Sequence, residues 1–181
     1  YADLSAEMLR DDDYQIRAED RGSAVIIIAP HGGTIEPETS LIAEAIAGSD
    51  YSYYLFEALK AGAHGDFHIT SHRFDEPQAL ELVASAQVAV AIHGRKDDGT
   101  ETVWLGARAE ALRDAIGAAL RDAGFDAAPN TTLPGVHETN ICNRTRSGEG
   151  VQLELPRSLR RILAEDADML ERFCLAVREA L

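Results

Sequence analysis

Two histidines in this sequence stand where an apolar run gives way to glycine. The stretch AVIIIAPHGG leads through residues 24–29 into Pro30 and His31, and QVAVAIHG leads into His93. Glu36 follows His31 by five residues, at the start of a segment with helical periodicity. Two imidazoles and a carboxylate are a protein ligand set of catalytic zinc, which keeps its fourth position open for water. The residue types therefore indicate a zinc site, provided that the fold brings the three side chains together.

Strand direction decides whether they meet. In open α/β sheets, ligands bind at the carboxyl ends of parallel strands, where the loops converge. If the two apolar runs are parallel strands, His31 and His93 emerge at one edge, and Glu36 can fold back to meet them. The same residues also have simpler roles. A strand-end histidine is commonly a hydrogen-bonded surface residue, and a glutamate that opens a helix commonly complements the helix dipole. The pattern alone leaves both interpretations open.

Strand-like and helix-like segments alternate along the chain, which predicts a single α/β domain over residues 1–181. Apolar or alternating runs predict strands at 14–18, 24–29, 51–56, 67–69, 87–92, 125–127 and 151–155. Helices are expected after Glu36, around Pro77, over 106–125 and over about 158–180. Pro37 and Pro77 suit the first turn of a helix, and Gly124 suits the end of one.

Composition narrows the classes of function. The chain has 181 residues, 45% of them hydrophobic, and no apolar run approaches the roughly 18 residues of a membrane span. The acidic N-terminal segment shows no signal peptide, so we expect a cytoplasmic protein that does not associate with membranes. A net charge of −14 argues against nucleic-acid binding. The two cysteines, Cys142 and Cys174, lack zinc-site spacing. Cys142 is expected to pack in the interior, with a thiol nucleophile as the alternative.

Four segments, taken together and in order, carry a resemblance to a known family. They are APHGGTIEPETSLIAEAI, HITSHRFDEP, AIHG and TNICNRTRSGEGVQLELPRSLR. They resemble the poly-γ-glutamate hydrolases, known from bacteriophages that degrade capsular poly-γ-glutamate, over about residues 14–161, with the catalytic motifs within 24–161. The resemblance implies a zinc carboxypeptidase-like α/β fold, in which a mixed open sheet is flanked by helices on both faces. It also implies one zinc ion held by His31, Glu36 and His93, a catalytic carboxylate at Glu154, and possible release by phage lysis.

Glu154 has a pattern argument of its own. Val151, Leu153 and Leu155 alternate with Gln152 and Glu154, so the last two share one face of a strand. One interpretation is that the two residues face solvent on an edge strand. The other is that this face of the strand places the Glu154 carboxylate beside metal-bound water. Zinc lowers the pKa of its water to about 7, and a nearby glutamate can take that proton and pass it to the leaving nitrogen. Glu138 is the reserve candidate for this role.

An acidic protein that hydrolyses a polyanion needs a local basic patch. Five arginines fall within eighteen residues: Arg144, Arg146, Arg157, Arg160 and Arg161. Guanidinium binds carboxylate bidentately, so we expect Arg144, with Asn143, Arg95, Arg157 and His68, to bind substrate. A salt-bridge network at a helix start is the alternative, particularly for Arg160 and Arg161. His64 and His72 are expected at the surface, and His137 is a candidate either to support a site residue or to contact substrate.

The leading hypothesis is a zinc-dependent hydrolase of γ-glutamyl amide bonds in an anionic γ-glutamyl polymer. The first alternative is a zinc deacylase of small N-acyl amino acids, and the second is a non-catalytic binding module that contains a metal. Chain length of the substrate separates the two enzymes. The sequence does not determine the exact substrate, endo or exo cleavage, or the oligomeric state.

Overall fold

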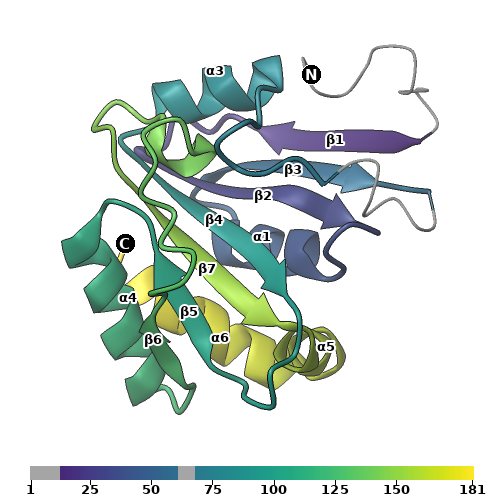
Figure 1. Cartoon of the computed structure of the whole chain (residues 1–181), viewed down its shortest axis with the longest axis vertical. Coiled ribbons are helices and arrows are strands. Elements are labelled where there is room, and N and C mark those ends of the chain that lie inside the picture. The colour runs from purple at the N-terminus through teal and green to yellow at the C-terminus, as the bar shows by residue number, and fades with distance from the viewer. Residues whose placement is uncertain (1–12, 61–67) are drawn as a thin grey trace.

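A seven-stranded mixed sheet forms the centre of the computed structural model, which describes residues 13–60 and 68–181 (Figure 1). The strands are β1 (Tyr14–Glu19), β2 (Val25–Gly33), β3 (Ser52–Ala58), β4 (Val88–Arg95), β5 (Val103–Gly106), β6 (Ala127–Pro129) and β7 (Gly150–Pro156). The helices are α1 (Thr39–Ala47), α3 (Pro77–Ser85), α4 (Glu110–Asp122), α5 (Arg157–Glu165) and α6 (Ala167–Glu179), with a 3₁₀ turn η1 (Ile141–Asn143). The order across the sheet is β1-β3-β2-β4-β7-β5-β6.

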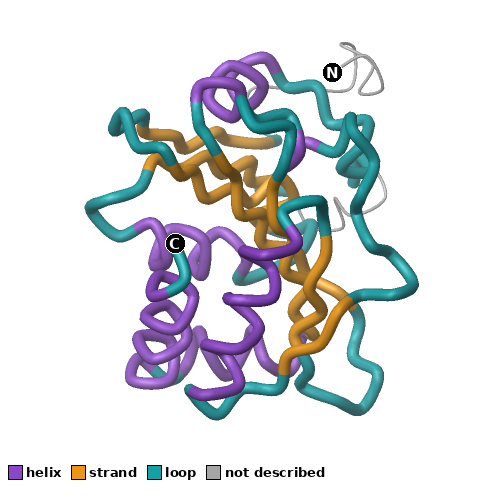
Figure 2. Tube along the Cα trace, turned by 90° about the vertical axis from the view of Figure 1, so that its left-hand side faces the viewer, coloured by secondary structure: helices purple, strands orange, loops and turns teal. Residues whose placement is uncertain are grey.

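The central strands are buried on both faces, and their side chains alternate between two apolar layers. In β2, Ile27 packs into a layer with α1, α4, α5 and α6, whereas Ile26 and Ile28 face a layer with α3 and η1. In Figure 2 most of the helical tube lies to one side of the strands. The prediction of one α/β domain with a mixed sheet and helices on both faces is confirmed. Among the described residues, no helix is both long and apolar enough to cross a bilayer.

Strand direction answers the first question raised by the sequence. β2, β3, β4 and β7 run parallel, as their arrowheads in Figure 1 show, whereas β1 and β5 are antiparallel to their neighbours β3 and β7. Ile28 lies opposite Ala91, so β2 and β4 end at the same edge. In the next strand, Glu154 lies opposite His93. The expected strand-end histidines and the glutamate of β7 therefore meet at one carboxyl edge.

Three details differ from the sequence prediction. β5 lies in a segment for which no strand was predicted, and it pairs Trp104 with Glu154. The helix expected over about 158–180 is two helices, because Asp166 is extended and its carboxylate caps α6 by accepting from Met169 N. Residues 68 and 69 of the predicted strand 67–69 are not in a strand, and residue 67 lies outside the described residues, as does His64.

The predicted end of α4 is confirmed. Gly124 has φ +87°, and its N–H donates to the carbonyl of Arg121, while Phe125 N–H donates to that of Leu120. These two bonds satisfy carbonyls that would otherwise lack partners at the helix end, and glycine adopts the left-handed conformation without the penalty of a side chain.

Candidate metal centre

The glycines after His31 let β2 end in a tight return. The pairing of β2 with β3 shifts register between Ala29 and Gly32, and a Cβ on Gly33 would lie 2.1 Å from the carbonyl oxygen of Ala58. Gly33 also has φ +65°, so only glycine fits this close approach. The chain then turns back, and Glu36 N–H donates to the His31 carbonyl at 2.9 Å. This return places the Glu36 carboxylate beside the His31 ring.

The three predicted ligands come together. His31 Nδ1 lies 3.2 Å from Glu36 Oε1 and 3.2 Å from His93 Nδ1, and His93 Nδ1 lies 3.6 Å from Glu36 Oε2. His31, Glu36 and His93 are all buried. The carboxylate is also fixed from the sheet, because Gly94 N–H donates to Glu36 Oε2 at 2.8 Å.

The hydrogen bonds of His31 suit a cation. Its Nε2 lies 2.6 Å from the carbonyl oxygen of Ile69, which can only accept, so Nε2 carries a proton. In the neutral ring, Nδ1 then presents a lone pair to Glu36 Oε1, and two acceptors at this distance repel unless a cation or a second proton lies with them. Burial lowers the pKa of His31 and so disfavours that second proton, even though Glu36 acts in the opposite sense. The donor set therefore fits a zinc ion.

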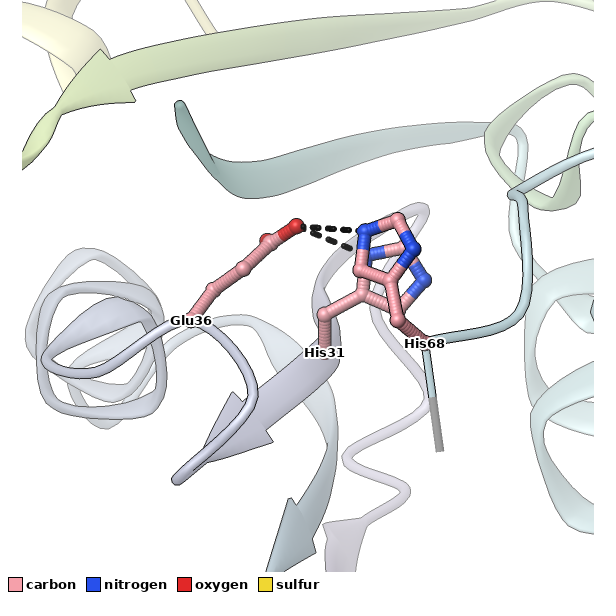
Figure 3. A group of neighbouring side chains, drawn as sticks. All are labelled: His31, Glu36 and His68. Atoms are coloured by element: carbon pink, nitrogen blue, oxygen red, sulfur yellow. Dashed lines mark hydrogen bonds and ion pairs between the residues drawn. The ribbon is translucent and has the colours of Figure 1, made fainter. Parts of the chain in front are cut away.

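His68 is a fourth member of this cluster. His31, Glu36 and His68 offer atoms that all lie within 4.8 Å of one another, and His68 Nε2 is 3.1 Å from Glu36 Oε1. Figure 3 shows Glu36 reaching across to both rings, with His68 coming from a separate loop. The sequence predicted His68 as a substrate residue, whereas its position also allows it to bind a metal. His68 is more exposed than His93, which lies on β4.

Glu154 lies at the end of a chain of side-chain amides. Asn140 Oδ1 accepts from Cys142 N, so its Nδ2 donates to Gln152 Oε1 at 3.1 Å. Gln152 Nε2 must then donate to Glu154 Oε1, at 2.8 Å. Burial raises the pKa of Glu154, although the charge of a protonated His93 and the hydrogen bond from Gln152 oppose it. The carboxylate is thus oriented and partly desolvated, which suits a group that accepts a proton.

A cavity of about 710 Å³ opens over the cluster. Its basic and imidazole side chains are Arg95, Lys96, His31, His68, His72, His93 and His137. The acidic side chains among its described lining residues are Glu36 and Glu154. The chain as a whole has a net charge of −14, so the cavity wall formed by these arginine, lysine and histidine side chains is a local concentration of cationic and neutral hydrogen-bond donors.

The predicted substrate residues divide into two groups. Arg95 lines the cavity, stacked 4.1 Å over the Trp104 ring and paired with Asp98 at 2.9 Å. Arg144 and Arg157 are not among the described lining residues, and Arg144 Nε donates to the carbonyl of Thr139. Asn143 is buried away from the cavity and donates to the carbonyls of residues 135 and 137, so it holds the loop that forms part of the cavity wall.

Other predicted roles can also be located. Burial raises the pKa of the Cys142 thiol to about 12, which suits packing and opposes a thiolate nucleophile. His72 lies at the cavity beside His137, with ring centroids 5.5 Å apart. Glu138 is exposed and is not among the described lining residues. Sequence reasoning did not predict the contact of Ser71 Oγ with His93 Nε2, at 3.3 Å, or the hydrogen bond that links Gln152 to Glu154.

The structure is an α/β domain that gathers imidazoles and carboxylates at the carboxyl edge of parallel strands, an arrangement that could hold a metal ion. The family model described as Poly-gamma-glutamate hydrolase matches residues 1–174, and the chain belongs to this family. The prophage-derived UPF0714 protein YoqZ of Bacillus subtilis (strain 168) is 39% identical over 168 residues, covering 91% of this chain and 58% of YoqZ. The chain spans 58% to 66% of the length of three such B. subtilis relatives.

Two solved structures share the fold closely. A bacteriophage poly-gamma-glutamate hydrolase superposes with a TM-score of 0.91 at 29% identity, covering 98% of this chain and 92% of the other. A zinc-free apo structure of YndL superposes with a TM-score of 0.89 at 27% identity, covering 96% and 92%. The resemblance to the poly-γ-glutamate hydrolases and the α/β fold with a mixed sheet are therefore confirmed.

Proposed function

We propose that this domain hydrolyses γ-glutamyl amide bonds in an anionic polymer such as poly-γ-glutamate, with one zinc ion at His31, Glu36 and His93. The observation that carries the proposal is the lone pair of His31 Nδ1 facing the Glu36 carboxylate at 3.2 Å, beside His93. The family and the zinc-free form of YndL support it. When bound, zinc would polarise the amide carbonyl and acidify water.

The side chains of this chain supply the remaining chemistry. Glu154, held by Gln152, accepts a proton from water and returns it to the leaving nitrogen, which an amide requires because its amine leaves poorly unprotonated. Arg95 and Lys96 bring positive charge to the cavity wall, where carboxylates of a γ-glutamyl chain bind favourably. The negative charge elsewhere on the chain favours entry of the polymer at this wall over other surfaces.

The test combines metal content with polymer length. Protein purified without added metal should contain one zinc per chain by elemental analysis and should lower the viscosity of poly-γ-glutamate. Release of acyl groups from small N-acyl amino acids without a fall in viscosity would favour the deacylase instead. Zinc binding with no hydrolysis of either substrate would favour the remaining hypothesis, a non-catalytic binding module that contains a metal.

Two matched variants distinguish the possible ligands. His93→Ala should lose zinc and retain the fold, because the site lies at a sheet edge rather than within the apolar layers. His68→Ala should retain most of the zinc, because His31, Glu36 and His93 remain. The reverse pattern would assign the third ligand to His68.

A further inference from the structure

Arg160, on α5, lies buried behind the candidate metal centre rather than in its cavity. We propose that Arg160 is the positioning residue that sets the relative placement of Glu36, His93 and Glu154. The inference rests on the proposed function for the roles of those three residues. It does not make Arg160 a substrate residue, because Arg160 is not among the described residues that line the cavity.

The guanidinium joins two segments through their carbonyls. Arg160 Nη1 donates to the carbonyl of Pro37, and Nε donates to that of Leu155 at 3.3 Å. Pro37 follows Glu36 directly, and Leu155 follows Glu154 directly. One planar side chain therefore fixes the backbone beside the proposed metal carboxylate and the backbone beside the proposed base, which come from distant parts of the sequence.

The third contact is made by packing. A Cβ built on Gly94 would lie 2.6 Å from Arg160 Cζ, so the guanidinium occupies the space that a side chain at 94 would need. Gly94 follows His93 directly, and its N–H donates to Glu36 Oε2. Arg160 thus touches the residue that follows each of the three proposed site residues.

The buried charge of Arg160 has an ionic partner. Its Nη1 lies 3.6 Å from Glu38 Oε2, and Glu38 has φ +72°, a conformation that non-glycine residues rarely adopt. A buried cation is unfavourable unless it is paired and hydrogen-bonded. Here the ion pair with Glu38 and the hydrogen bond to the Pro37 carbonyl act on the same short segment, the bend between Glu36 and α1.

The first experiment compares Arg160→Met with Arg161→Met, an exposed neighbour on the same helix. Zinc affinity is measured by competition with a chelator, and kcat and KM with poly-γ-glutamate. Arg160→Met should weaken zinc binding about 10–100-fold, as loss of residues that orient metal ligands does, and should lower kcat more than it changes KM. Arg160→Lys should recover only part of the loss, because one ammonium cannot reproduce the guanidinium's geometry toward both carbonyls. Parent-like zinc affinity and kcat in Arg160→Met would overturn the proposal.

The second experiment approaches the same contact from Gly94, so its single variant can be judged even where Arg160→Met folds poorly by circular dichroism. Gly94→Ala keeps the arginine but displaces its guanidinium, so it should weaken zinc binding relative to the parent, and parent-like zinc affinity in Gly94→Ala would contradict the proposal. Where Arg160→Met is folded, the space beside Gly94 is free in it, so adding Gly94→Ala should change zinc affinity little further. Additive effects of the two substitutions would mean that Arg160 and Gly94 act independently, which the proposal forbids.

The outcomes separate this inference from the proposed function. A parent that binds zinc but cleaves no poly-γ-glutamate refutes the substrate, while the zinc affinities still judge Arg160. A parent that binds no zinc refutes the metal centre. Arg160 is then judged by amide exchange at Gly94, whose N–H is bonded to Glu36. Exchange should be faster in Arg160→Met than in Arg161→Met, and equal rates would overturn the positioning role.

Discussion

Glu36 and Glu154 lie at one sheet edge, yet their surroundings act on them in opposite senses. Burial by itself acts to raise the pKa of both carboxyl groups. At Glu36, the surrounding histidines His31, His68 and His93 outweigh burial and hold the pKa of the carboxyl well below its usual range. At Glu154, burial prevails and the pKa is raised. Two carboxyl groups whose pKa values are moved apart in this way can take different roles in one site. Glu36 is suited to remain ionised as the proposed metal ligand, and Glu154 is suited to exchange a proton.

Glu154→Gln tests that division. The amide keeps the shape of the side chain but cannot accept a proton, so kcat should fall at least about 10²-fold, the lower end of general-base effects. Zinc content and substrate affinity should be retained, because the three proposed metal ligands are other side chains. The measurement is a kcat and KM determination with metal analysis of the same sample. Near-normal turnover with zinc bound would transfer the role to another carboxylate.

Gln152→Met tests whether the amide chain acts through Glu154. Methionine fills a similar volume but cannot donate to Glu154 Oε1, so the carboxylate loses the bond that orients it. We expect kcat to fall about 10-fold with little change in zinc content. In the Glu154→Gln background the same substitution should have almost no further effect on kcat. A full additional loss there would show that Gln152 contacts substrate instead of positioning Glu154.

Among the elements, long apolar strands were predictable and short connecting pieces were not. The run at 24–29 and its partner at 87–92 are buried on both faces, so composition alone reveals them. β5 has four residues and gains its partners from β6 and β7, which no local pattern encodes. The position of Arg144 was equally hidden, because the turn at η1 directs Arg144 toward the carbonyl of Thr139. Sequence found the candidate ligands, but not the loops that complete the cavity wall.

The loop at 130–137 gives the cavity an apolar lip. Leu133 is 65% exposed and Val136 is 54% exposed, and both line the cavity. The loop is held in place, since Asn130 accepts from Leu133 N and Ala107 N–H donates to the carbonyl of Pro134. An apolar lip beside cationic groups fits a γ-glutamyl chain, which presents methylenes between its carboxylates.

Leu133→Ser should therefore raise KM for poly-γ-glutamate about 4-fold, the effect of losing about one buried methylene, with kcat nearly unchanged. Val136→Ser should behave in the same way. Leu175→Ser is the matched control, because Leu175 is 57% exposed on α6 and does not line this cavity. An equal KM change in the control, or no change in either lip variant, would remove the lip from substrate binding.

For the molecule as a whole, acidification acts on two separate places. Zinc ligands must be deprotonated to bind, so low pH should release metal from the proposed site at the sheet edge. Independently, Glu57 on β3 ties β1 to the sheet, since Arg17 Nε and Gln15 Nε2 donate to its Oε2 at 2.9 Å and 2.8 Å. Burial raises the pKa of Glu57, but these bonds outweigh burial and lower it below its ordinary value.

A group whose folded pKa is depressed stabilises the fold above its unfolded pKa and loses that effect as pH falls through the folded value. The free energy of unfolding of the metal-free parent should therefore exceed that of Glu57→Gln by about 1–2 kcal/mol at pH 7. This value allows for solvent screening of the ion pair, because Arg17 is partly exposed. The difference should hold down to about pH 4.3, the ordinary carboxyl pKa, and then shrink. Urea unfolding in chelator from pH 7 to 3 measures it. Glu44→Gln, which removes the more exposed partner of Arg17, should have a smaller effect. A gap that stays constant down to pH 3 would show that the charge of Glu57 contributes nothing to stability.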